Sequence, residues 1–159
     1  AALAIDDVAR RAGVNKTTVY RRWPTKSALA QAAFEQFGES VAAPDTGTLR
    51  GDLRALIRSR IQLAKTPRGR ALMRGIHAEA LGPELLAISR RMRQRDLAVY
   101  ERIFSRSRAR GELRRDVDDV LLMSLLEGVF MVRFLHDGKI ATAAEVDRVI
   151  DLVLRGALT

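Results

Sequence analysis

Apolar residues recur along this chain at the three- and four-residue spacing of helices, and no stretch shows the alternation typical of strands. Gly and Pro interrupt the pattern and predict where the helices end. The predicted helices cover residues 5–12, 16–23, 26–41, 49–65, 67–82, 83–110, 117–137 and 142–156. The sequence therefore predicts an all-α fold. The break at 44–47 divides it into residues 1–43 and residues 44–159.

The stretch 5–26 predicts two short helices that meet at a glycine turn. The apolar positions on one side of the first helix are Ile5, Val8, Ala9 and Ala12. Gly13 supplies the positive-φ residue that ends a helix, Asn15 can cap the next helix, and Val14 is expected to bury in the corner. Pro24 ends the second helix. Two helices joined in this way form the helix-turn-helix pattern, which places a helix in the DNA major groove.

The second helix carries side chains that suit DNA binding. Cationic and hydroxyl groups, which bind phosphates and base edges, are crowded at Lys16, Thr17, Thr18, Tyr20, Arg21 and Arg22. Only Val19 and Trp23 are placed to anchor this helix to a core. A lone basic helix is more often a solvated surface. Here the glycine turn, the amphipathic first helix and the proline stop occur together, which favours DNA reading.

These residues resemble the DNA-binding signature of the TetR family of transcriptional regulators. The resemblance rests on Ile5 to Ala9, Ala12 to Val14, Thr18 to Tyr20, Trp23 and Lys26. It implies a DNA site formed by Lys16, Thr17, Thr18, Tyr20, Arg21, Trp23 and Lys26, with Lys26 on a phosphate. Ala4 departs from the family, which usually has a capping Thr or Ser there. The family also has a helix before this signature, and the sequence holds at most its trailing edge.

Length and composition narrow the alternatives. A chain of 159 residues can build a small domain and a larger one. It has no Cys, which excludes disulfides and thiolate chemistry and fits a reducing compartment, so we expect a cytoplasmic protein. His77 and His136 are isolated, so neither a metal nor another cofactor is expected. The longest apolar stretch, residues 120–132, is shorter than the roughly 20 residues that a membrane span needs.

The net charge of +9 suits a nucleic-acid partner, but little of it lies near the motif. Residues 1–40 hold six Lys or Arg against four Asp or Glu. The excess lies in the segments 50–74 and 90–115, which we expect to be salt-bridged solvent faces rather than a second DNA surface. The charge therefore supports long-range attraction to a polyanion, while docking depends on the local motif.

The two C-terminal helices predict self-association. Residues 117–135 are apolar nearly all round, which suggests a helix covered on two sides. We expect a second copy of the chain to cover it in a four-helix interface, where the resemblance also puts the family's dimer contact. The predicted interface residues are Leu122, Leu126, Val129, Val146, Val149, Ile150 and Val153. The alternative is a helix buried within a monomer. A dimer predicts a palindromic operator with half-sites about 34 Å apart, or a multiple of this.

The resemblance also implies a small-molecule effector in the larger domain, which weakens operator binding by favouring another arrangement of the two DNA-reading parts. Candidate lining residues are Met73, His77, Tyr100, Phe104, Glu127, Phe130, Met131 and Phe134. For the Met and aromatic side chains, core packing is the stronger alternative. Glu127 lies on an apolar helix and needs a partner, most simply one of the many arginines.

An enzymatic function is the alternative to a DNA-binding regulator. The chain has no GxSxG, no HExxH and no Gly-rich phosphate loop. His77 and Glu79 are two residues apart on a predicted helix and do not face each other. We therefore expect no catalysis. A non-specific DNA-compacting protein stays open as an alternative, and it would bind DNA without discriminating between sequences.

Overall fold

The computed structural model describes residues 5–37, 42–67, 69–70 and 83–156. Within these residues there are seven α-helices. They are α1 (Ile5–Ala12), α2 (Lys16–Arg22), α3 (Lys26–Phe37), α4 (Leu49–Lys65), α6 (Pro83–Ala109), α7 (Asp119–Asp137) and α8 (Ala143–Leu154). Their bounds agree closely with the predicted ones. The predicted helix 67–82 and the predicted end of 26–41 lie largely outside the described residues.

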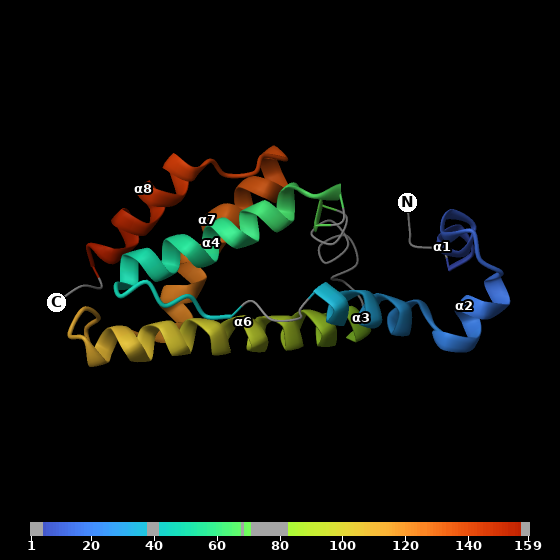
Figure 1. Cartoon of the computed structure of the whole chain (residues 1–159), viewed down its shortest axis with the longest axis horizontal. Helices are drawn as coiled ribbons and strands as arrows, with labels where there is room; N and C mark the ends of the chain where they lie inside the picture. Colours follow the sequence, from blue (N-terminus) through green and yellow to red (C-terminus); the bar gives the residue numbers. More distant parts are fainter. Residues whose placement is uncertain (1–4, 38–41, 68, 71–82, 157–159) are drawn as a thin grey trace.

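The helices form a small head and a larger body (Figure 1). We use head for α1, α2 and the start of α3, and body for α4, α6, α7 and α8. In the body, α4 packs on α6 and α8, and α7 packs on α6 and α8. The long helix α6 also contacts α3, so one helix connects the head to the body (Figure 1). No described helix is both long and apolar enough to cross a membrane.

Local signals explain where the helices begin and end. Thr142 begins α8 with a capping box, in which its hydroxyl accepts from the Glu145 N–H and the Glu145 carboxylate accepts from the Thr142 N–H. Asp118 caps α7 by accepting from Leu121 N. Gly138 ends α7 with φ 63°, a conformation that costs glycine little. These ends therefore follow from the sequence alone.

The body has one apolar core, built from α4, α6, α7 and α8. Its buried residues are Leu49, Leu53, Leu56, Ile57, Tyr100, Ile103, Phe104, Leu113, Leu122, Met123, Leu126, Ala141, Val146, Ile150 and Leu154. Burying a Leu or Ile side chain contributes roughly 1.5–3 kcal/mol, so this cluster makes a large favourable contribution to the stability of the body. The head has its own small core of Ile5, Ala9 and Val19.

Part of the predicted dimer interface is wrong, because four of its residues lie in the core of the body. Leu122, Leu126, Val146 and Ile150 are at most 2% exposed, because α7 and α8 turn these side chains toward α4 and α6. They are covered within one chain and are not available to a partner. Val149 and Val153 are half-buried, and Val129 is exposed. The helix α7 has apolar residues on both sides, and the sequence does not indicate which side faces the core.

Candidate nucleic-acid interface

The turn between α1 and α2 is fixed by main-chain hydrogen bonds and one side chain. Gly13 adopts φ 66°, and its N–H donates to the Arg10 carbonyl (3.3 Å). The Asn15 side chain accepts from Thr17 N (2.9 Å) and caps α2, as predicted. The prediction for Val14 is wrong, since its side chain is 45% exposed in this turn.

The helix α2 faces its core with one residue and solvent with the rest. Val19 is buried against Ile5 and Ala9 of α1. The side chains predicted to contact DNA from α2 are all exposed: Lys16, Thr17, Thr18, Tyr20 and Arg21. Since α2 is seven residues long, these groups form a short outward face that a major groove can admit. Lys26, at the first position of α3, is exposed as well.

Trp23 has a structural role that its neighbours explain. It ends α2, its N–H donates to the Val19 carbonyl (2.8 Å), and its half-buried ring packs against the head core. The Arg22 guanidinium lies 5.2 Å from the centre of that ring, in the range of a cation–π contact. A direct contact of Trp23 with DNA stays a prediction.

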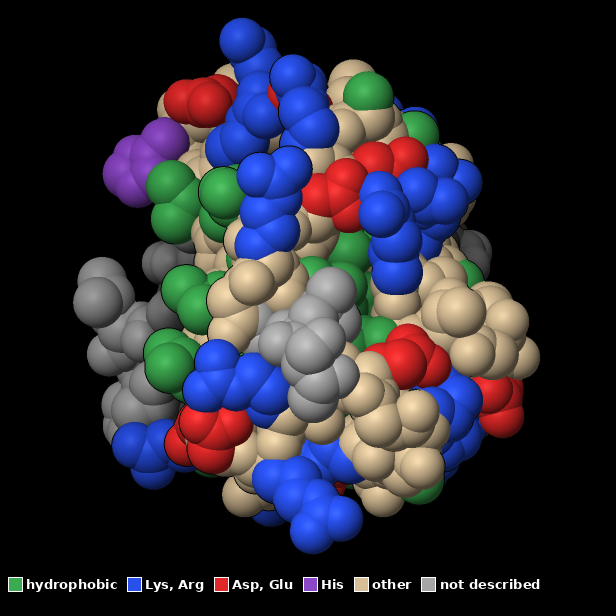
Figure 2. Space-filling view, turned by 90° about the vertical axis from the view of Figure 1, so that its left-hand side faces the viewer, with side chains coloured by type: hydrophobic (Ala, Val, Ile, Leu, Met, Phe, Trp, Pro, Cys, Tyr) green, Lys and Arg blue, Asp and Glu red, His purple; other side chains and the backbone are tan. Residues whose placement is uncertain are grey.

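The cations predicted to contact DNA differ from the body arginines in their ion pairing. None of the ion pairs between described residues involves Lys16, Arg21 or Lys26. Many body arginines are paired, for example Arg54 with Asp147 (2.7 Å). Figure 2 shows Lys and Arg interspersed with Asp and Glu over the body end of the molecule. The pairing agrees with the predicted salt-bridged faces.

A second polar cluster lies in the body, between α4, α6 and α7. The Arg60 guanidinium forms ion pairs with Asp96 (2.8 Å) and with Glu127. It also lies 5.3 Å from the centre of the Tyr100 ring. The predicted need of Glu127 for an arginine is therefore confirmed. Arg60 itself was not predicted here, because it lies 67 positions before Glu127 in the sequence and no local pattern pairs them.

Burial shifts the pKa of two groups in this cluster, Tyr100 and Asp96. It raises the pKa of Tyr100 to about 12, against the opposing effect of Arg60. Burial also raises the pKa of Asp96, although Arg60 and Arg95 act to lower it. The Tyr100 hydroxyl is buried and has no hydrogen-bond partner. An unpaired buried hydroxyl is unusual, which makes Tyr100 a candidate for contact with a ligand.

The structure describes four of the other residues predicted to line an effector site. Phe104 is fully buried and its ring centroid lies 5.5 Å from that of Tyr100, which fits the alternative of core packing. Phe130, Met131 and Phe134 are half-buried on α7. The two remaining candidates, Met73 and His77, lie outside the described residues. Effector binding by this set stays a prediction.

Both parts of the chain, the head and the helical body, match known protein families. Residues 1–33 match the family described as "Bacterial regulatory proteins, tetR family", and residues 43–153 match "Tetracyclin repressor-like, C-terminal domain". The chain belongs to the TetR family. This confirms the resemblance and the all-α fold with an N-terminal helix-turn-helix. The TetR family is one of transcriptional regulators rather than of enzymes.

Relatives with names support the same assignment. The chain is 32% identical to the "HTH-type transcriptional regulator AqdR" of Rhodococcus erythropolis, over 94% of this chain and 73% of AqdR. It is 33% identical to the "DNA-binding transcriptional repressor TetR" of Mycobacteroides abscessus, over 95% of this chain and 80% of that protein. This TetR-family chain is therefore a DNA-binding transcriptional regulator.

Solved structures of the TetR family have the same fold. The TetR family transcription regulator SCO0332 superposes with a TM-score of 0.76 and 28% identity, over 98% of this chain and 87% of the other. The SmeT–triclosan complex superposes with a TM-score of 0.70 and 22% identity, over 99% of this chain and 82% of the SmeT chain. At that identity SmeT supports the fold alone.

Proposed function

We propose that this regulator is a homodimeric repressor in the cytoplasm, which binds a palindromic operator through two α2 helices and is released by a small-molecule effector. The observation that carries the proposal is the exposed face of α2. Lys16, Thr17, Thr18, Tyr20 and Arg21 all point away from the head core, and this core holds the helix through Val19. Such a rigid, outward and cationic helix suits insertion into a major groove. The repressor name of a relative supports the direction of regulation.

An exposed apolar face on α7 supports the dimer. Leu121, Leu125, Val129 and Val132 are each more than 40% exposed, and their spacing puts them on one side of the helix. Leu152 of the adjacent α8 is 72% exposed. Exposed apolar side chains on two neighbouring helices favour association. A second copy is the economical partner, because a two-fold axis brings the same four helices together.

Gly128 adds to this argument. Its position on α7 falls on the same side as Leu121, Leu125 and Val132, and the space where a Cβ would stand is empty. A small residue in the middle of an apolar face allows a partner helix to approach closely. We therefore propose α7 and α8 as the interface, with the exposed face in place of the buried one.

An effector site in the body is supported by the Arg60 cluster. Arg60, Asp96 and Glu127 keep 23%, 40% and 29% of their side-chain surface exposed, so a ligand can reach them. The Tyr100 hydroxyl beside them is buried without a hydrogen-bond partner, and a ligand that enters the cluster would supply one. SmeT, which has the same fold, is described in complex with triclosan. An effector must prefer the chain's non-binding arrangement to release DNA.

Selection of bound sequences from random DNA, at one fixed salt concentration, tests the proposal. We expect a palindrome, with half-sites separated by about 34 Å or a multiple of it. A matched fragment with one half-site scrambled serves as the control and should bind much more weakly. Equal binding to all sequences would contradict the proposal and would favour the non-specific DNA-compacting alternative, since phosphate contacts alone do not discriminate. A single half-site would contradict the dimer.

A further inference from the structure

The exposed side chains of α2 do not all point in the same direction. Successive residues of an α-helix are turned by about 100° around its axis. Val19 marks the side of α2 that faces the head core, because it is 4% exposed and packs with Ile5 and Ala9. Thr17 and Arg21 are each about 200° away from Val19, so both lie on the side opposite the core. Since they are four residues apart, they form one ridge along the helix.

The other α2 side chains predicted to bind DNA lie nearer to the core side. Thr18 and Tyr20 are each about 100° from Val19, one on either flank of the ridge. Lys16 is only about 60° from Val19. All three are exposed, but none points as directly away from the core as the ridge does. A helix that enters a major groove with its core side toward the protein therefore brings the ridge closest to the base edges.

The two arginines at the end of α2 differ in what surrounds them. The Arg22 guanidinium lies 5.2 Å from the centre of the Trp23 ring, and its position on the helix is about 60° from Val19. Arg21 is in none of the ion pairs that join described residues. Its guanidinium is exposed and its donors can therefore bind a ligand in front of the helix.

Arginine and threonine favour different bases. Guanine presents its O6 and N7 atoms in the major groove, where a guanidinium can bind both with parallel hydrogen bonds. Thymine presents its methyl group there, and the methyl group of a threonine can contact it. Four residues of an α-helix rise about 6 Å, and neighbouring base pairs are about 3.4 Å apart. The ridge can therefore reach two bases that are one or two base pairs apart.

We propose that Thr17 and Arg21 determine which operator sequence is bound, with Arg21 on a guanine and Thr17 on the methyl group of a nearby thymine. Thr18 and Tyr20 then lie toward the two walls of the groove and fix the position of the helix. The assignment rests on the proposed function, which is operator binding through α2. It adds to that function the two bases that each half-site must contain and the residue that reads each of them.

Changes of single groups in the DNA test the two contacts separately. Selection from random DNA by the full chain first supplies the operator. The operator is then made with 7-deazaguanine, which lacks the N7 atom, or with deoxyuridine, which lacks the thymine methyl group, at one matching position of both half-sites at a time. Fluorescence anisotropy at one fixed salt concentration measures affinity. For the normal chain we expect a loss of about tenfold at one guanine position and about threefold at one thymine position.

Two variants should each lose one of these sensitivities. Arg21→Ala should bind the normal and the 7-deazaguanine operators equally well. Thr17→Ser, which removes only the methyl group, should bind the thymine and the deoxyuridine operators equally well. The matched controls are the neighbouring Arg22→Ala and Thr18→Ser, which carry similar changes about 100° further round the helix. Whatever their affinity, both controls should keep the sensitivities of the normal chain. All four positions are exposed, and circular dichroism checks that the variants keep their helices.

The possible results distinguish failure of this assignment from failure of the proposed function. If a palindrome is selected but Arg21→Ala still responds to 7-deazaguanine, or Thr17→Ser still responds to deoxyuridine, the assignment is overturned and the proposed function stands. Equal loss of sensitivity in the controls also overturns the assignment, because the contacts would then not belong to the ridge. Selection that returns no preferred sequence overturns both.

Discussion

Leu125 and Leu126 are neighbours on α7 that face opposite ways: Leu126 is completely buried in the body core, and Leu125 is 51% exposed. Substitutions at these two residues therefore distinguish packing within one chain, at Leu126, from the proposed packing between chains, at Leu125. The first prediction uses this difference. Leu125→Arg should convert the dimer to a monomer that keeps its fold, because a charge at a partner interface has no compensating group.

The control for this prediction is Leu126→Ala. It removes buried methyl groups and should destabilise the chain by about 3 kcal/mol, while the folded fraction still dimerises. Analytical ultracentrifugation measures association, and urea unfolding measures stability. A dimeric Leu125→Arg chain would show that the interface lies elsewhere.

The second prediction concerns the face of α2. Tyr20→Ala should weaken binding to the selected operator by about 1–3 kcal/mol, roughly tenfold or more, since a groove contact is lost. Lys26→Ala should weaken binding to all sequences and lower the salt slope by about one, as expected for a single phosphate contact. Fluorescence anisotropy titrations at several salt concentrations measure both effects.

Arg115→Ala in the body serves as the control for these variants, because it removes one exposed cation away from the head. It should leave operator affinity nearly unchanged. If Arg115→Ala and Lys26→Ala had equal effects on the salt slope, binding would depend on the charge of the whole molecule rather than on the face of α2.

The sequence predicts the helices and the head well because their signals are local. Gly13, Asn15, Thr142 and Gly138 each act within a few residues, so a helix end can be predicted without knowledge of the fold. The face of α2 follows in the same way, since Val19 is its only fully buried residue. The exposure of the side chains predicted to contact DNA could therefore be predicted residue by residue, while their contact with DNA stays a prediction.

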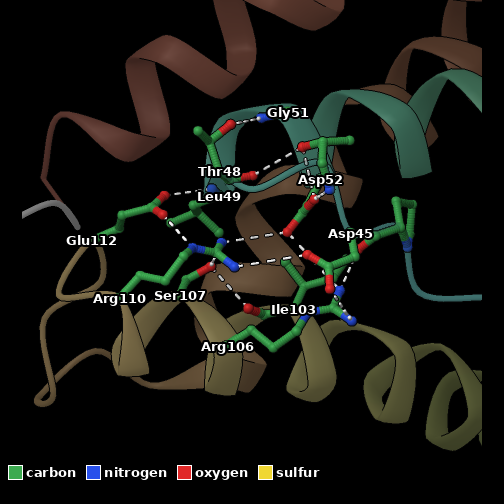
Figure 3. A network of polar contacts seen from close by, with 12 residues as sticks. Asp45, Thr48, Leu49, Gly51, Asp52, Ile103, Arg106, Ser107, Arg110 and Glu112 are labelled. Atoms are coloured by element: carbon green, nitrogen blue, oxygen red, sulfur yellow. Dashed lines mark hydrogen bonds and ion pairs between the residues drawn. The ribbon is translucent and has the colours of Figure 1, made fainter.

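Non-local contacts could not be predicted from the sequence. Leu126 and Leu125 differ only through the packing of α7 on its neighbours, and an apolar helix has no preferred side to indicate this. The partner of Glu127 is an arginine of α4, and Asp52 meets Arg106 and Arg110 from α6 (Figure 3). In a chain with 28 Lys and Arg, the composition predicts that carboxylates form ion pairs, but it does not indicate which basic residue pairs with which carboxylate.

The third prediction is a pH dependence. The hydrogen bond from the Thr142 N–H, with those from Arg133 and the Thr142 hydroxyl, lowers the pKa of Glu145 from 4.5 to about 2. A carboxyl group with a lowered pKa in the folded state stabilises that state above its unfolded pKa. This stabilisation should be fully present above about pH 5 and should be lost as the pH falls from 4.5 toward 2.

Glu145→Gln tests this prediction. The variant keeps the length of the side chain but cannot titrate, so its urea midpoint should fall less steeply with acid than that of the normal chain. Asp118→Asn, which alters the cap of α7, is the control and should leave the contribution of Glu145 in place. Identical acid profiles for the normal chain and Glu145→Gln would contradict the assignment.

The last prediction concerns Arg60, which holds two carboxylates. Arg60→Leu should destabilise the folded chain by about 2–3 kcal/mol, less than the loss of a fully buried pair, because Asp96 and Glu127 keep some contact with water. Glu127→Gln should cost less than Arg60→Leu, since Arg60 keeps its ion pair with Asp96. Arg58→Leu on the same helix is the control and should cost under about 1 kcal/mol, as Arg58 makes one exposed pair with Asp147. Urea unfolding at neutral pH measures all three variants. Equal losses for Arg58→Leu and Arg60→Leu would mean that the cluster contributes no more than a surface ion pair.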